Sequence, residues 1–230
     1  MKKRTIALVL AAMLALSLLT GCGGKENPAV ETQAPATEAL QDKELSLGVW
    51  EGYTYTNSYA GIGCTLDGSW VAYAADQLQE LPNTVRDMME GSELGDAMAN
   101  VTQFTDMYAE NAQLMVNMNI LFQKQDLQQR ITYAGMDELD VLEATLSQKD
   151  LLVDGYAQAG IMVEDIQIVK VTFLGEEHYA MKTVAQTQGV GYYCLQLFDF
   201  WLGEYSATIT FASFVEDNTE SMLDLFFAVD

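Results

Sequence analysis

VGYYCLQLFDFWLGEYSATITFASF, from Val190 to Phe214, is the stretch of sequence that decides the fold. Two runs rich in aromatic and β-branched residues flank Leu202-Gly203, a spacing typical of a β-hairpin. Apolar side chains of the first run alternate to both faces: Tyr193, Leu195 and Leu197 on one, Tyr192, Cys194 and Phe198 on the other. A strand that is apolar on both faces needs cover on both faces. The stretch therefore predicts an antiparallel sheet flanked by helices on both faces.

The segments before this hairpin extend the same sheet. Residues 162–174 and 179–186 are strand-like, and short turns that contain glycine separate all four strands at hairpin distances. Residues 137–157 carry leucine and valine at helical spacing, with Asp137 at the position of an N-cap. The sequence pattern of this half of the chain therefore predicts a helix followed by a four-stranded antiparallel meander.

The rest of the domain alternates between strands and helices. The patterns predict strands at 49–57, 62–66, 101–108 and 114–123, a broken helix at 75–100 and a final helix at 219–228. Residues 45–230 are enough for one domain with its own core, and we find no internal repeat in them. We therefore expect a single α+β domain over residues 45–230.

A motif near the start of this domain reads Tyr55-Thr56-Asn57-Ser58-Tyr59-Ala60-Gly61-Ile62, followed by Leu66-Asp67-Gly68-Ser69-Trp70. It resembles the start of small lipoproteins of Gram-positive bacteria, which begin YTNxYxGxxF and continue with LPxGW. Cys64 stands where the family has an aromatic residue, and Asp67 replaces the usual proline. The resemblance implies a PsbP-like fold, and it implies no agreed activity or catalytic residue.

The amino terminus is typical of an export signal. Lys2, Lys3 and Arg4 precede an apolar run that is too short for a stable membrane span, which needs about 20 residues. The run ends in Leu19-Thr20-Gly21-Cys22, which resembles the lipobox of bacterial lipoproteins. The resemblance implies cleavage between Gly21 and Cys22 and a diacylglycerol with palmitate-type chains on the Cys22 thiol. The alternatives are a soluble secreted protein with an incidental cysteine and a retained, uncleaved helix.

The residues after Cys22 predict a flexible linker, and the composition limits the partners. Residues 22–44 hold two of the three prolines and no aromatic residue. Loss of residues 1–21 leaves eight basic against 33 acidic residues, a net charge of −25. Such a charge argues against nucleic acid and against electrostatic docking on anionic lipid. The sequence therefore predicts a domain held at the extracytoplasmic face of the cell membrane by its lipid alone.

Candidate catalytic and metal-binding residues are few. His178 is the only histidine, and we interpret it as a solvated hairpin residue, because no nucleophile can be placed beside it. The acidic clusters Glu164-Asp165, Glu176-Glu177 and Glu216-Asp217-Asn218 lack the alternating oxygen ligands of a calcium loop. No phosphate-binding, dinucleotide-binding or nucleophile-elbow motif occurs. We expect no cofactor, no metal site and no enzymatic activity.

Two cysteines remain after Cys22 is lipidated. An oxidising location and an even count permit a disulfide between Cys64 and Cys194. Their apolar neighbours instead favour free thiols that pack as small hydrophobic groups. The sequence leaves both alternatives open, because geometry decides between them.

These observations support three hypotheses of function. The first is a lipid-anchored, non-enzymatic domain that binds an unknown protein partner or assists an envelope complex. The second is a small-molecule or cation-binding accessory domain of a transporter, with a pocket lined by Trp50, Tyr53, Tyr55 and Trp70, although core filling is the better interpretation of these aromatics. The third is a hydrolase, which requires a serine or cysteine beside His178.

Overall fold

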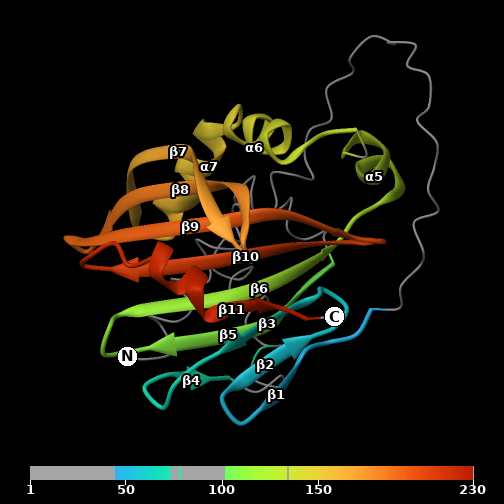
Figure 1. Ribbon diagram of the computed structural model, residues 1–230. Coiled ribbons are helices and arrows are strands. Elements are labelled where there is room, and N and C mark those ends of the chain that lie inside the picture. Colours follow the sequence, from blue (N-terminus) through green and yellow to red (C-terminus); the bar gives the residue numbers. More distant parts are fainter. Residues whose placement is uncertain (1–44, 74–77, 79–101, 134, 230) are drawn as a thin grey trace.

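The computed structural model describes residues 45–73, 78, 102–133 and 135–229, and two antiparallel sheets dominate it (Figure 1). The large sheet has the order β4-β5-β6-β10-β9-β8-β7 and the small sheet the order β1-β2-β3-β11. The strands of the large sheet are β4 (Val71–Ala72), β5 (Gln103–Asn111), β6 (Val116–Lys124), β7 (Ile161–Phe173), β8 (Glu176–Thr187), β9 (Val190–Leu202) and β10 (Tyr205–Phe214). Those of the small sheet are β1 (Val49–Glu51), β2 (Thr54–Asn57), β3 (Ile62–Thr65) and β11 (Phe226–Ala228).

The meander β7 to β10 confirms the sequence-based prediction. Each of these strands pairs with the next in antiparallel register. Gln188 and Gly189 both have positive φ between β8 and β9, the conformation of a two-residue turn whose twist matches that of the strands. Glycine takes this conformation without a Cβ clash, which explains its place in the turn.

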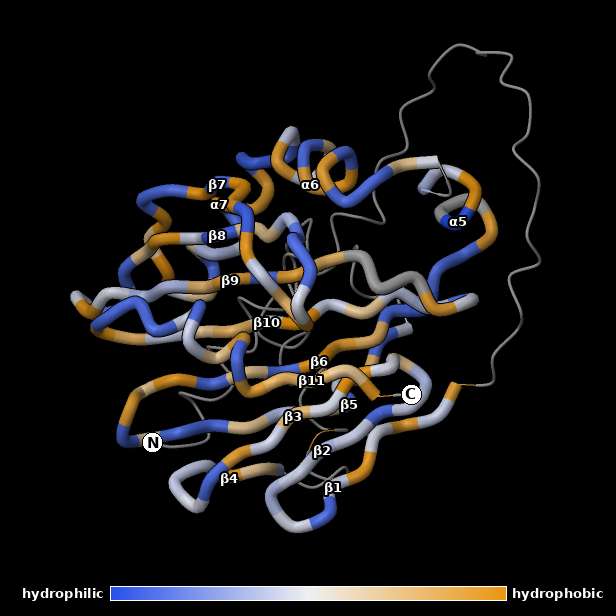
Figure 2. Tube along the Cα trace, viewed as in Figure 1, coloured by the Kyte–Doolittle hydropathy of each residue, from blue (hydrophilic) through white to orange (hydrophobic). Residues whose placement is uncertain are grey.

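The large sheet has a core on each face. One core lies between the sheet and the helices α6 (Glu138–Leu146) and α7 (Lys149–Gln158), and Tyr192 and Cys194 of β9 belong to it. The other core lies between the two sheets, and it contains Leu195 and Leu197 of the same strand. Hydrophobic segments accordingly run along β6, β9 and β10 in Figure 2.

The cover on the two faces differs from the expectation. Helices α6 and α7 cover one face, whereas the small sheet and the short 3₁₀ helix η2 (Glu220–Leu225) lie against the other. Helices on both faces are thus not confirmed by the described residues. The coarser prediction of an α+β domain with an antiparallel sheet covered on both faces is confirmed.

Several predicted helices differ from the structure. The helix predicted at 137–157 is divided into α6 and α7, although Asp137 caps α6 as expected and forms a reciprocal capping box with Asp140. Helix α5 (Leu127–Tyr133) was not predicted. The final helix predicted at 219–228 is wrong, because the chain turns from η2 into β11, which pairs with β3. The helix predicted at 75–100 lies outside the described residues except for Leu78, which is helical and buried.

Candidate functional site

The predicted lipid-attachment site lies outside the described residues. Gly21 and Cys22, where cleavage and lipidation are expected, belong to residues 1–44. Both therefore stay predictions from the sequence. Among the residues with described structure, no helix combines the length and the hydrophobicity needed to cross a bilayer.

The structure does not bring Cys64 and Cys194 together. Both are free and buried, Cys64 in the core between the two sheets and Cys194 in the core beneath the helices. The large sheet separates these two cores. Burial raises the pKa of each thiol to about 12, so the reactive thiolate is disfavoured at both positions. The structure thus shows both as buried thiols that pack as small hydrophobic groups.

His178 is more engaged than the sequence indicated. Its side chain is only 19% exposed, and Nδ1 lies 2.5 Å from Oε1 of Glu138, in the first turn of α6. The backbone N–H of Tyr179 donates to the other carboxylate oxygen at 3.0 Å. The interpretation of His178 as a solvated hairpin residue is therefore wrong. The pair joins α6 to β8.

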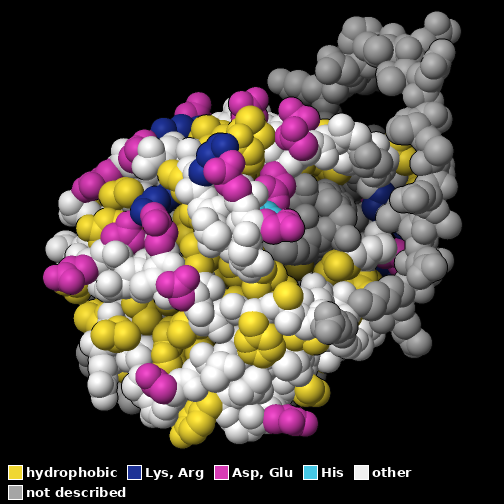
Figure 3. All heavy atoms as spheres, in the orientation of Figure 1, with side chains coloured by type: hydrophobic (Ala, Val, Ile, Leu, Met, Phe, Trp, Pro, Cys, Tyr) yellow, Lys and Arg dark blue, Asp and Glu magenta, His cyan; other side chains and the backbone are white. Residues whose placement is uncertain are grey.

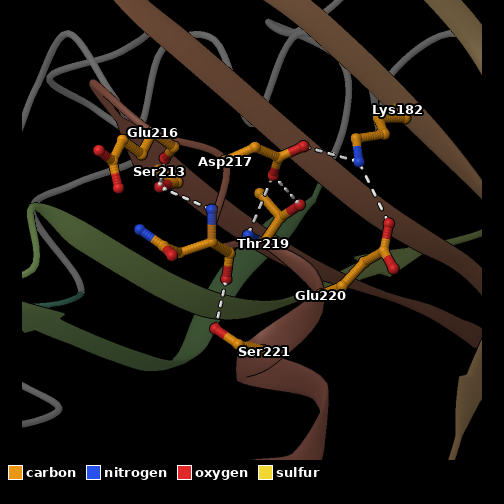
Figure 4. Close-up of polar contacts among 8 residues, drawn as sticks. Lys182, Ser213, Glu216, Asp217, Thr219, Glu220 and Ser221 are labelled. Carbon is orange, nitrogen blue, oxygen red and sulfur yellow. Dashed lines mark hydrogen bonds and ion pairs between the residues drawn. The ribbon is translucent and has the colours of Figure 1, made fainter.

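The acidic cluster at the end of β10 is partly neutralised by a lysine (Figure 4). Lys182 Nζ on β8 lies 2.7 Å from Asp217 Oδ2 and 3.2 Å from Glu220 Oε1. Asp217 also accepts from the hydroxyl of Thr219 at 2.6 Å, while the hydroxyl of Ser221 donates to the carbonyl of Asn218 at 2.8 Å. Burial alone would raise the pKa of Asp217, but the bonds from Lys182 and Thr219 outweigh it and lower the pKa. Among the described residues, no three His, Cys, Asp or Glu side chains gather as a metal site would require.

The four aromatics of the hypothetical pocket do not converge. Tyr55 and Trp70 belong to the core between the sheets, and Trp50 packs against that core with its ring 5.4 Å from the ring of Tyr55. Tyr53 is exposed. Core filling is thus confirmed for three of the four.

A buried carboxylate explains the first motif of the domain. Asp106 of β5 accepts hydrogen bonds from the hydroxyl of Tyr55, from Asn57 Nδ2 at 2.6 Å and from the backbone N–H of Gly48 at 2.9 Å. Asn57 Oδ1 also accepts from the backbone N–H of Ala60 at 2.9 Å. Two side chains of the YTN motif thus fix the small sheet on the large one, which is a structural role.

A row of uncharged polar side chains occupies the α6–α7 side of the four strands β5, β6, β9 and β10. We call it the polar face, and it consists of Gln103, Thr105, Asn117, Asn119, Gln123, Gln196, Thr208 and Thr210. Directly paired residues of antiparallel strands point to the same side, so the pairs Gln103–Gln123 and Thr210–Asn119 place these groups next to one another. All but Gln103 are buried.

Several atoms of the polar face have no hydrogen-bond partner among the residues that the structure describes. They are Gln103 Oε1, Thr105 Oγ1, Asn117 Oδ1 and both Oε1 and Nε2 of Gln123. The hydroxyl of Tyr192, on the same side of β9, also lacks a partner among the described residues. Each buried polar atom left unpaired costs about 1–3 kcal/mol, and native proteins pair nearly all of them. Their concentration on one surface distinguishes the polar face from the apolar core around it.

A second unusual surface is the end of the large sheet at which three turns meet. We call it the apolar tip, and its exposed side chains are Leu114 (59%), Met115 (47%), Val190 (37%) and Val215 (57%). The backbone N–H of Phe214 donates to the carbonyl of Met115, and that of Val215 to the carbonyl of Gly191, both at 3.0 Å. The turns are therefore fixed to one another, and the hydrophobic β5–β6 turn is visible at the left of Figure 2.

Two residues of the apolar tip have strained backbones. Met115 has a φ of 53° and Val215 a φ of 73°, in the left-handed region that favours glycine. A β-branched residue is especially unfavourable there, and such strain is found most often at functional sites. The positive φ of these two residues was not predicted, because a bulky residue in a turn gives no sequence signal for this conformation.

Comparisons with known proteins assign no family. The chain matches no protein-family model and no curated protein. Among solved structures it is similar to the solution structure of cyanobacterial PsbP (CyanoP) from Synechocystis sp. PCC 6803. The TM-score is 0.44 and the identity 12%, over 76% of this chain and 91% of that one. A likeness of this size carries no information on activity or ligands.

Proposed function

We propose that this chain is a lipid-anchored protein of the extracytoplasmic membrane face whose domain binds a protein partner through the apolar tip, without catalysis. The observation that carries the proposal is the exposure of four bulky apolar side chains on three turns that are fixed to one another. Exposed apolar groups gathered at one place mark interaction sites more often than isolated ones do. A rigid patch also loses little conformational entropy on binding.

The anchor rests on the sequence. Leu19-Thr20-Gly21-Cys22 resembles a lipobox, and the motif that begins at Tyr55 resembles small lipoproteins of PsbP-like fold. We propose membership of that group. A diacylglycerol on Cys22 gives stable attachment, and residues 22–44 as a coil would hold the domain about 25 Å from the bilayer.

The charge and the position of the apolar tip favour a protein partner over the membrane. Glu164 and Glu216 are exposed beside the tip, and the turns 111–116, 187–191 and 213–216 contain no lysine or arginine. In Figure 3 the left end of the visible face shows hydrophobic side chains among acidic ones. In Figure 1 the described chain begins at the right, whereas the β5–β6 turn of the apolar tip lies at the left end of the large sheet. We therefore expect a partner surface with an apolar centre and a basic rim.

Site-specific photocrosslinking tests the docking surface. A photoreactive phenylalanine analogue replaces Leu114 or Val190 in the full-length protein, expressed in its own envelope. Leu127 on α5 is the matched control, because it is also exposed (67%) but lies outside the tip. We expect one adduct from both tip positions and at least tenfold less of it from position 127. Equal yields at all three positions, or no adduct at the tip, would contradict the proposal.

A second experiment tests the anchor separately. Metabolic labelling with a palmitate analogue should label the wild-type protein and leave Cys22→Ser unlabelled and released from the membrane fraction. Cys64→Ser is the control, because its thiol is buried in the core and takes no lipid in this proposal. Equal labelling of Cys22→Ser and the wild type would refute lipidation at this residue and leave the docking experiment valid.

A further inference from the structure

We infer that helix α5 is a second contact with the membrane, where Leu127 and Ile131 enter the surface of a phospholipid bilayer. The inference rests on the proposed lipid anchor, which brings the domain to the bilayer, and it is independent of the apolar tip. Leu127 is 67% exposed and Ile131 69%, more than any other large hydrophobic side chain among the described residues. Residues four apart on a helix lie on the same face, so the two side chains form one exposed ridge, which we call the α5 ridge.

The α5 ridge lies at the end of the large sheet away from the apolar tip. Strand β6 begins at Val116, next to the tip, and ends at Lys124, just before α5. At 3.4 Å per residue, the strand separates these two ends by about 27 Å. In Figure 1, α5 lies at the right, on the side where the described chain begins. The proposed linker enters the domain on this side, and its length of about 25 Å as a coil allows the α5 ridge to reach the bilayer.

The charges beside the α5 ridge suit phospholipid headgroups. Lys124 precedes α5 and Arg130 belongs to it, and both contact the carboxylate of Glu204, at 3.2 Å and 3.5 Å. With Asp126, residues 124–133 and Glu204 hold two bases and two acids, whereas the chain without residues 1–21 has a net charge of −25. An anionic bilayer therefore repels this surface less than it repels the chain as a whole. The long side chains of Lys124 and Arg130 can extend to phosphate oxygens while the ridge enters the apolar layer.

A bilayer fits the α5 ridge better than a protein partner does. Two side chains bury far less surface than the roughly 1,200 Å² of a stable protein interface. A weak membrane contact is sufficient, because the lipid anchor keeps the domain beside the bilayer and makes the contact an intramolecular event. The contact would also orient the domain, with the apolar tip directed away from the membrane and open to its partner.

Photocrosslinking to lipid tests this inference. The full-length protein, purified from its membrane fraction, is reconstituted in vesicles of phosphatidylglycerol and phosphatidylcholine in equal parts, with a photoreactive phenylalanine analogue at position 127, 131, 114 or 162. Leu114 and Met162 are the matched controls, because they are 59% and 64% exposed and lie at the other end of the large sheet. A lipid adduct is identified by the added mass of one phospholipid. The intact mass before illumination also reports the diacylglycerol on Cys22, so failure of the anchor and failure of the α5 ridge are separate results.

We expect at least tenfold more lipid adduct from positions 127 and 131 than from positions 114 and 162. Ile131→Ser should lower the yield from position 127 at least fivefold, whereas Met162→Ser, an equivalent change away from α5, should leave it unchanged. Melting curves establish that every variant is folded. Equal lipid yields at all four positions, no lipid adduct at 127 and 131, or a yield that Ile131→Ser leaves unchanged would overturn the inference, whether or not Cys22 carries a lipid. In the intact envelope, a protein adduct in place of the lipid adduct at 127 and 131 would also overturn it, and would identify the ridge as a protein interface.

Discussion

The hydroxyl of Tyr55 on β2 donates to Oδ2 of Asp106 on β5, and this buried bond joins the two sheets. A register shift between Thr105 and Met107 makes it possible. The bulge directs Asp106 and Met107 to the core between the sheets, while Thr105 points to the polar face. One irregularity in one strand therefore permits the bond between the sheets and also places Thr105 on the polar face.

Tyr55→Phe should lower the free energy of unfolding by about 1–2 kcal/mol, because a buried carboxylate loses one of its donors. Chemical denaturation at pH 7 measures the change. Tyr53→Phe is the matched control, since Tyr53 is exposed, and it should stay within about 0.5 kcal/mol of the wild type. Equal effects of the two substitutions would show that the bond to Asp106 contributes no net stability.

Thr105→Val should raise stability by up to about 1 kcal/mol, because it replaces an unpaired buried hydroxyl with a methyl group of the same shape. Thr219→Val makes the same change where the hydroxyl donates to Asp217, and it should lower stability by about 1 kcal/mol. Thermal melts of the two variants give opposite signs if the hydroxyl of Thr105 lacks a partner in the free protein. A loss of stability in both would show that the free protein already satisfies it.

Gly63→Ala should destabilise the protein by about 2 kcal/mol or more. A Cβ at this position of β3 would lie 2.6 Å from the ring of Phe227 and 2.8 Å from the backbone oxygen of Tyr55, and a backbone oxygen in a sheet cannot move aside. Gly135→Ala is the control, because nothing lies within 4 Å of its Cβ, and it should be neutral or slightly stabilising. Comparable melting temperatures for the two variants would mean that β3 can shift to accept the methyl group.

Lys182→Met should cost about 1 kcal/mol at neutral pH, and the cost should depend on pH. Burial acts against the charge of Lys182, but Asp217 and Glu220 raise its pKa above the ordinary 10.5, so its contribution is full below that value and is lost as pH rises through the higher pKa. Asp217 has its pKa lowered from 3.8, so its contribution is present above that value and is lost on acidification.

Denaturation from pH 3 to pH 11 should therefore show a difference between the wild type and Lys182→Met that is largest between about pH 5 and pH 9. Lys170→Met is the control, because its pair with Glu177 is exposed and exposed pairs contribute little. A difference that is constant over the whole range would assign the loss to packing of the lysine stem.

The sequence predicts the meander because each strand of β7 to β10 pairs with its neighbour along the chain. It does not predict β11. This strand pairs with β3, and the paired residues Phe226 and Cys64 are more than 160 residues apart in the sequence. The bond between His178 and Glu138 spans 40 residues and gives no local signal either. Local patterns thus identify the elements, while the pairing of distant segments decides the ends of helices and the partners of single side chains.

The polar face shows a different limit. Alternation in β6 places Val116, Met118 and Ile120 on one side and the amides Asn117 and Asn119 on the other. Alternation alone suggests solvent on the amide side, but the structure buries both residues. The available signal was the kind of polar residue, because the polar positions of β6 before Lys124 are all amides and none is charged.

Val215→Asn should increase stability and reduce partner capture at once. Asparagine tolerates a positive φ better than a β-branched residue, so relief of the backbone at position 215 should add about 1 kcal/mol. The same change removes an exposed apolar side chain from the apolar tip, so the yield of the crosslink from position 114 should fall at least fivefold. Val190→Asn is the matched control, because Val190 is not among the residues with positive φ. It should reduce capture without a gain in stability. A loss of stability in Val215→Asn would show that packing of the valine side chain contributes more than relief of the backbone strain. Undiminished capture in both variants would exclude the apolar tip as the docking surface.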